Sequence, residues 1–113
     1  MSRNESAVRL HHMLDHAREA VALSEGKTRS DLDQDRILNL ALVRLLEIVG
    51  EAASRTPKEE RQNHPEIDWP QIVGLRNRLI HGYDFVDFDL LWHKINDGLP
   101  PLIVRLKEIL NPK

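Results

Sequence analysis

The sequence lacks cysteine altogether, so it can form neither a disulfide framework nor a metal site built on thiolates. It also lacks any apolar run near the ~20 residues that a membrane-spanning helix needs, and no apolar segment follows its first residues as in a secretory signal. A chain without disulfides fits a reducing compartment. From these absences we expect a cytoplasmic protein without a membrane segment, and a length of 113 residues suits one domain over residues 1–113.

Charge of one sign is not concentrated anywhere. The 16 Lys and Arg residues and the 18 Asp and Glu residues are interspersed, for a formal net charge of −2. A protein that binds nucleic acid without specificity is usually basic. If this protein handles RNA, we therefore expect a local basic cluster such as Arg76 with Arg78 to make the contact, and a second subunit would double that cluster.

Aromatic residues are few, at 4% of the chain. All of them lie between residues 69 and 92, and they are Trp69, Tyr83, Phe85, Phe88 and Trp92. We expect Trp69 and Trp92, beside apolar residues at predicted helix starts, to lie in the core or an interface rather than to stack on bases. The same window contains residues 76–83, the one stretch whose composition indicates a functional site.

What the sequence does contain is aliphatic residues at helical spacing. This pattern predicts a first helix over residues 5–23, a second from Ser30 or Asp31 to residue 54, and a short turn of helix over 57–62. A third helix should be capped by Asp68 and a fourth by Asp87 or a neighbouring residue. With no alternation typical of strands, the chain is predicted to be all-α, a four-helix up-and-down bundle with an extra short helix.

Two helices carry features that constrain their packing. The apolar residues of the second helix wrap too far round for a one-sided surface helix, so we expect it to be central or to bury a second face in a dimer. Gly50 within it costs about 1 kcal/mol against alanine, and such a glycine usually permits a close helix approach. Pro100 and Pro101 should kink the last helix or split it in two.

Four side chains of residues 76–83 suit cleavage of RNA without a metal. His81, with the ordinary histidine pKa of about 6.5, can take the proton of a ribose 2′-hydroxyl or give one to the leaving 5′-oxygen. Arg76 can hold the phosphate and stabilise its developing charge. Asn77 is a candidate to orient His81 or the phosphate, and Arg78 is either a second phosphate contact or a solvated charge.

The spacing of Arg76 and His81 leaves their cooperation open. Five residues on an ideal helix place them about 140° apart. Either the helix ends before His81, or Arg76 reaches round the helix, or each subunit of a symmetric dimer completes the other's site. The alternative is that the spacing arose by chance, with His81 interacting with helix-terminal carbonyls, Arg76 paired with a surface acid and Tyr83 packed with its hydroxyl outward.

Residues 76–83 resemble the Arg-x4-His-x-Tyr signature of HEPN domains, specifically the HepT-like ribonuclease toxins. The resemblance extends from about Ile37 to the C-terminus through segments in the same order, namely residues 48–53, 65–69, 72–75 and 85–87. It implies an α-helical homodimer in which Arg76 and His81 of both subunits face a shared cleft. It also implies metal-independent endoribonuclease activity on RNA, with no cofactor.

The same resemblance implies a protein partner. Members of the family are typically paired with a small nucleotidyltransferase of the MNT type, an antitoxin that transfers AMP from ATP to the motif tyrosine, here Tyr83, as in a type VII-like toxin–antitoxin system. An attached AMP would place negative charge beside Arg76 and occupy the position of an RNA nucleotide. Two other functions stay open: a non-catalytic HEPN module that binds a nucleotidyltransferase, and a nucleotide-binding regulator.

Two further groups of side chains are weaker candidates. His12 and His16 have the i, i+4 spacing that can bind a divalent ion, with His11 beside them, but no carboxylate joins them and we assign no metal site. Glu47 and Glu51 share a helix face, where a buried carboxylate pair could do acid–base work. The simpler expectation is that at least one of them holds an arginine.

Overall fold

The computed structural model describes residues 3–81 and 86–111, and everything below on structure refers to these residues. Most of them are helical, and no strand occurs among them. The elements are α1 (Arg3–Ser24), α2 (Asp31–Gln34), α3 (Arg36–Arg55), α4 (Lys58–Asn63), α5 (Trp69–His81), α6 (Phe88–His93), the π-helix η1 (Lys94–Gly98) and α7 (Leu99–Leu110). The fold is therefore all-α, as predicted. None of the helices in the described ranges is long and apolar enough to cross a membrane.

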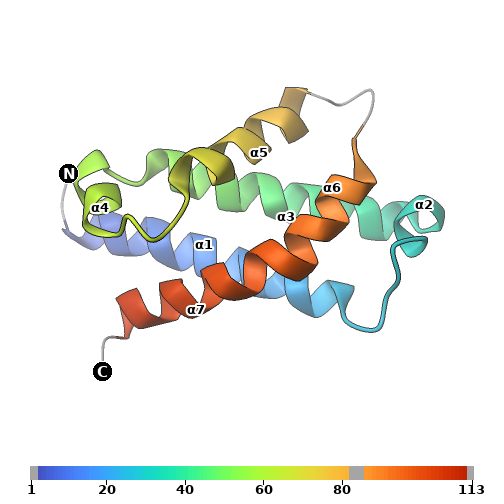
Figure 1. Ribbon diagram of the computed structural model, residues 1–113, viewed down its shortest axis with the longest axis horizontal. Helices are drawn as coiled ribbons and strands as arrows, with labels where there is room; N and C mark the ends of the chain where they lie inside the picture. The colour runs from blue at the N-terminus through green and yellow to red at the C-terminus, as the bar shows by residue number, and fades with distance from the viewer. Residues whose placement is uncertain (1–2, 82–85, 112–113) are drawn as a thin grey trace.

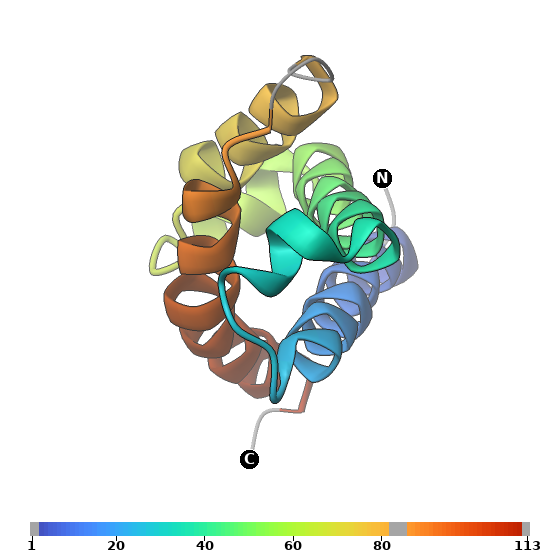
Figure 2. The ribbon, with the colours of Figure 1, turned by 90° about the vertical axis from the view of Figure 1, so that its right-hand side faces the viewer.

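Helix α3 is the centre of the bundle. It packs against α1 on one side and α5 on the other, and α7 closes the bundle against α1 (Figures 1 and 2). Fully buried aliphatic side chains such as Met13, Leu42 and Leu106 come from α1, α3 and α7 and meet in one core. The C-terminal half of α5 projects from the bundle and is covered on fewer sides (Figures 1 and 2). The prediction of a central second helix is confirmed.

The predicted second helix is in fact two helices. Asp35 has an extended backbone between α2 and α3, and its side chain accepts a hydrogen bond from the Leu38 amide at 3.0 Å, so it caps α3. Ser30 makes no side-chain capping bond. The buried Asn39 donates to the Leu32 carbonyl at 2.8 Å and satisfies a carbonyl that the break would otherwise leave unpaired. The start predicted at Ser30 or Asp31 therefore belongs to α2 alone.

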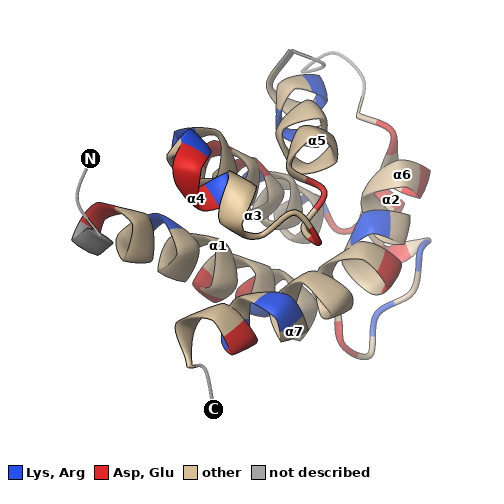
Figure 3. Ribbon diagram, turned by 60° about the vertical axis from the view of Figure 1, so that its left-hand side comes forward, with Lys and Arg blue, Asp and Glu red and all other residues tan. Residues whose placement is uncertain are grey.

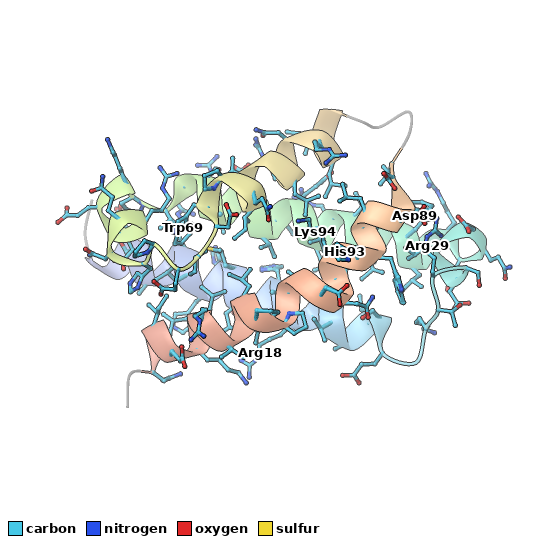
Figure 4. All side chains as sticks on the ribbon, in the orientation of Figure 1. Arg18, Arg29, Trp69, Asp89, His93 and Lys94 are labelled. Carbon is cyan, nitrogen blue, oxygen red and sulfur yellow. The ribbon has the colours of Figure 1, made fainter. Side chains whose placement is uncertain are left out.

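Helix α5 begins as predicted. Asp68 accepts from the Gln71 amide at 3.1 Å, although the Gln71 side chain accepts from Lys94 instead of reaching back to the cap. Trp69 is buried, and its indole N–H donates to the His64 carbonyl at 3.0 Å (Figure 4). Trp69 is thus a core residue that anchors the first turn of α5. The short helix before it runs over Lys58–Asn63, one residue later than predicted.

The last part of the chain is split, as the prolines predicted. Asp87 caps α6 by accepting from the Leu90 amide at 3.0 Å. A π-helical turn then joins α6 to α7, and Pro100 lies in the first turn of α7, where its missing N–H is not needed. At the start of α6, Arg29 donates through Nε to Asp89 at 2.6 Å and ties the loop before α2 to this helix (Figure 4).

Candidate active site

The Arg76–His81 stretch occupies the last two turns of α5. Its backbone is helical through His81, so the helix does not end before that residue. The two positions therefore stay about 140° apart around the helix axis. A helix end before His81 therefore cannot bring the two side chains together. Two routes remain: Arg76 can reach round the helix, or a second subunit can complete the site.

A glycine on α3 fixes the base of the Arg76 side chain. A Cβ built on Gly50 would lie 2.1 Å from Arg76 Cβ, 2.9 Å from its Cγ and 3.1 Å from the Ile72 carbonyl oxygen. No other residue fits at position 50 unless α5 moves away. The close helix approach predicted from Gly50 is confirmed, and its contact is the motif arginine itself.

The guanidinium of Arg76 is held by two groups. Its Nη2 forms an ion pair with Glu51 Oε1, and its Nη1 donates to Asn77 Oδ1 at 2.7 Å. The other oxygen of Glu51 accepts from Arg55 Nε at 2.6 Å. Glu51 thus joins two arginines, and both guanidinium groups lie around one carboxylate on the face where α3 meets α5. The side chains of Arg76, Glu51 and Arg55 are 27%, 36% and 60% exposed, so this cluster is open to solvent.

The charge state of the cluster follows from these contacts. The hydrogen bond from Arg55 is the largest cause that lowers the pKa of Glu51, and the bond from Arg76 adds to it, while partial burial opposes both. Glu51 is therefore ionised at neutral pH. Two guanidinium charges around one carboxylate leave a net charge of about +1, which attracts a phosphate.

The predicted supporting residues have different environments. Asn77 contacts Arg76, so in this structure it orients the arginine. Arg78 is exposed and forms no ion pair with any described residue, which leaves its guanidinium available. Figure 3 shows that the basic positions of α5 lie on its projecting part. The side chain of His81 and the whole of Tyr83 lie outside the described residues, so their predicted roles stay predictions.

Sequence reasoning missed the contact between Glu51 and Arg76. It predicted that at least one of Glu47 and Glu51 holds an arginine, and the bond of Glu51 to Arg55 confirms this. It also foresaw that Arg76 could pair with an acid, but it did not connect the two, because 25 residues separate them. The available signal was Gly50, which marked a close contact immediately before Glu51. The second acid of the pair, Glu47, is bound to Arg44 at 3.3 Å.

Two histidines of α1, His12 and His16, lie close together, with ring centroids 6.2 Å apart in an edge-to-face arrangement. His16 Nδ1 lies 2.7 Å from the His12 carbonyl oxygen, a position in which the ring nitrogen donates. Among the described residues there is no group of three or more His, Cys, Asp or Glu side chains that could hold a metal ion.

An apolar surface on α3 is left uncovered beside the motif. Ile37 is 82% exposed, although it belongs to the apolar set that predicted a helix covered on two faces, and Leu40 is 51% exposed. Leu40 also lines a groove between α3, the end of α5 and the start of α6, together with Leu79 and Phe88. This apolar surface and the motif are therefore neighbours along the same helix pair.

Comparison with known proteins assigns the family. The model of the "Ribonuclease HepT-like" family matches residues 13–109. A protein of Caldanaerobacter subterraneus subsp. tengcongensis named "Putative RNase" is 38% identical over 101 residues, which cover 89% of this chain and 90% of the relative. "Probable ribonuclease HepT" of Thermococcus cleftensis is 37% identical over 93 residues, covering 79% of this chain and 84% of that protein. No solved structure matches the chain.

Proposed function

Because the chain belongs to the HepT-like ribonuclease family, we propose that it is a metal-independent endoribonuclease toxin that cleaves RNA with Arg76 and His81. The observation that carries the proposal is the placement of Arg76. Its guanidinium is held at an open, net-positive cluster on the helix that also carries His81. Both relatives described above bear the names of ribonucleases, and this supports the proposal.

The chemistry follows from the two residues. A neutral His81 removes the proton of a ribose 2′-hydroxyl, and the 2′-oxygen attacks the adjacent phosphorus. Arg76 binds the phosphate oxygens, whose negative charge increases as the phosphorus becomes five-coordinate. The bond to the 5′-oxygen breaks, and that oxygen takes a proton from an acid. In an in-line displacement the attacking 2′-oxygen and the leaving 5′-oxygen lie on opposite sides of the phosphorus, so a second acid, such as His81 of a second copy, protonates the leaving oxygen.

A homodimer satisfies this requirement and the helical geometry together. The positions of Arg76 and His81 lie about 140° apart around one helix, so a twofold arrangement of two α5 helices could bring each arginine near the other copy's histidine. The exposed Ile37 and Leu40 offer an apolar surface beside α5 for the second copy. Replacing Ile37 by aspartate should convert a dimer to monomers in light scattering. A monomeric wild-type chain would contradict the dimer directly.

The toxin–antitoxin part of the proposal concerns Tyr83. A cognate nucleotidyltransferase of the MNT type would transfer AMP from ATP to the tyrosine hydroxyl, releasing pyrophosphate. The added phosphodiester would neutralise the positive charge around Arg76, and the adenosine would block the cleft. The check is intact-mass analysis of the wild type and Tyr83→Phe after incubation with the partner and ATP. A gain of AMP by both chains would refute modification of Tyr83.

The experiment that tests the core proposal compares the wild type with Arg76→Ala and His81→Ala. Each is expressed from an inducible promoter, growth is followed and total RNA is examined, and the purified proteins are assayed on RNA in the presence of EDTA. Arg105→Ala is the matched control, because Arg105 is an exposed arginine of α7 that pairs only with Glu108 among the described residues. Only the wild type and the control should arrest growth and cleave RNA.

The ion pair of Arg76 with Glu51 favours one alternative. Under it, Arg76 serves only to fasten α5 to α3, and the protein is a non-catalytic helical module that binds a nucleotidyltransferase. In that case all four proteins would behave alike on RNA, and binding to the partner would be the sole activity. Equal behaviour of the four proteins would therefore refute the ribonuclease.

A further inference from the structure

Glu51 differs from the other acids that pair with arginine on the bundle surface. Glu47 and Glu108 each bind one arginine on their own helix, three residues away, as ordinary local pairs. Glu51 binds Arg55 on its own helix and also Arg76 on α5. A local pair leaves no net charge, whereas the carboxylate of Glu51 leaves one positive charge in excess and links two helices.

We propose that Glu51 is a positioning residue that holds Arg55 and Arg76 side by side, so that the two guanidinium groups bind neighbouring phosphates of an RNA strand. This inference rests on the proposed ribonuclease function and extends it to two residues outside the Arg-x4-His-x-Tyr motif. Arg76 binds the phosphate that is cleaved. Arg55 binds the next phosphate along the strand and contributes affinity.

The structure restrains Arg76 at both ends of its side chain. Its Cβ and Cγ lie against the position of the missing Gly50 side chain, so the stem cannot shift toward α3. Glu51, the next residue after Gly50, binds the far end of the same side chain. A flexible arginine is thereby placed before substrate arrives, which lowers the cost of ordering it in the transition state.

Enough donors remain on both arginines to bind a substrate. A guanidinium carries five N–H groups. In this structure Arg76 uses one on Glu51 and one on Asn77, and Arg55 uses its Nε–H on Glu51. Three donors of Arg76 and four of Arg55 are therefore left, in a cluster that is partly open to solvent. Glu51 thus orients both guanidinium groups without using up their capacity for phosphate.

Removal of Glu51 should affect the affinity for RNA and the rate of cleavage differently, and this makes the inference testable. Removing a negative charge raises the local positive charge, so electrostatics alone predicts RNA binding at least as tight as in the wild type. Loss of the holding carboxylate lets Arg76 move, and a misplacement of about 1 Å near the reacting groups can cost about a hundredfold in rate. Positioning therefore predicts slower cleavage despite retained affinity.

The experiment measures cleavage of a short single-stranded RNA at saturating concentration by the wild type, Glu51→Ala, Glu51→Gln and the control Glu108→Gln. Circular dichroism and light scattering verify that each variant is folded and assembled like the wild type. Glu51→Ala should cleave RNA at least tenfold more slowly than the wild type, with an unchanged KM. Glu51→Gln should cleave faster than Glu51→Ala, because its amide oxygen can still accept from an arginine. Glu108→Gln should cleave at the wild-type rate. A folded Glu51→Ala that cleaves at the wild-type rate would overturn the positioning role.

Arg55 is tested by binding in a His81→Ala background, where the RNA stays intact. The affinity of a fluorescent single-stranded RNA is measured at several salt concentrations with and without Arg55→Ala, with Arg105→Ala as the control. Loss of one phosphate contact should reduce the slope of log affinity against log salt by about 0.7, and the control should leave it unchanged. An unchanged slope in Arg55→Ala would refute the contact. If Arg76→Ala still cleaves RNA, the proposed function fails instead.

Discussion

Replacing Gly50 by alanine is the sharpest test of how α3 positions the motif arginine. The new Cβ would meet Arg76 Cβ at 2.1 Å, whereas ordinary contacts begin near 3.4 Å. The two helices must therefore separate by at least about 1.3 Å at this point. Overpacking costs about 1–3 kcal/mol; a Cβ–Cβ contact of 2.1 Å belongs to the upper part of that range, about 2–3 kcal/mol, and the better helix propensity of alanine returns about 1 kcal/mol. We expect a net loss of stability of about 1–2 kcal/mol.

The size of that loss is measurable by thermal or urea unfolding. For a chain of this length it should lower Tm by about 4–8 °C. The matched control is Gly74→Ala on α5, because a Cβ at Gly74 meets no other atom within 4 Å. The control should be stabilised by up to about 1 kcal/mol, since alanine replaces glycine inside a helix. The same substitution on two facing helices should thus act in opposite directions.

The rate of RNA cleavage by Gly50→Ala provides a second test of the contact between α3 and Arg76. A shift of more than about 1 Å in the helix that carries Arg76 should reduce cleavage of RNA by about a hundredfold, in excess of any fraction unfolded. Gly74→Ala should cleave RNA at the wild-type rate. If Gly50→Ala unfolds at the same temperature as the control and cleaves RNA equally well, the close contact between α3 and Arg76 is wrong.

Three further predictions concern local contacts. Asp87→Ala removes the cap that accepts from the Leu90 amide and should cost about 1 kcal/mol in urea unfolding; an unchanged midpoint would mean that α6 needs no cap. Thr56→Val removes the buried hydroxyl that donates to the Ala52 carbonyl and should also cost about 1 kcal/mol, with hydrogen exchange locating the loss at the end of α3. The folded-state pKa of Glu51 is lowered, so its ionised carboxylate stabilises the fold above its unfolded pKa of about 4.3, and this stabilisation is lost as pH falls below that value. Glu51→Gln should therefore be less stable than the wild type at neutral pH, and the difference in free energy of unfolding should shrink in acid. A difference that does not depend on pH would contradict the lowered pKa.

Local signals predicted the helices well where one side chain determined a boundary. Asp68 and Asp87 cap α5 and α6 through amides three residues ahead, and such contacts depend on the sequence alone. The break at Asp35 was missed because several polar residues before α3 were equally able to cap a helix. The apolar periodicity continues across the break. The position of the break depends on Asn39, which donates to a carbonyl of α2 from inside the core.

The candidate site was predicted in part for the same reason. The motif on α5 is contiguous, so Arg76, Asn77 and Arg78 were recognisable as a group. The participation of Glu51 and Arg55 depends on how α3 crosses α5, which no single segment encodes. Gly50 indicated that a crossing exists, but it did not indicate which residue of the other helix would lie there.

The ion pair of Arg76 with Glu51 is compatible with both a structural and a catalytic role for the arginine, and the magnitudes of the two effects favour the proposed catalytic role. A partly exposed ion pair contributes only about 0–1 kcal/mol to stability, so α5 does not depend on it to stay on α3. Charge stabilisation by one well-placed donor in a transition state is worth about 2.7–4 kcal/mol. A phosphate with developing charge can therefore bind the remaining donors of Arg76 at little cost to the fold, while the packing against Gly50 and the bond to Glu51 keep the side chain in place. A phosphate-binding arginine needs a fixed position and free donors. An ion pair that contributes little to stability but orients the side chain meets both needs.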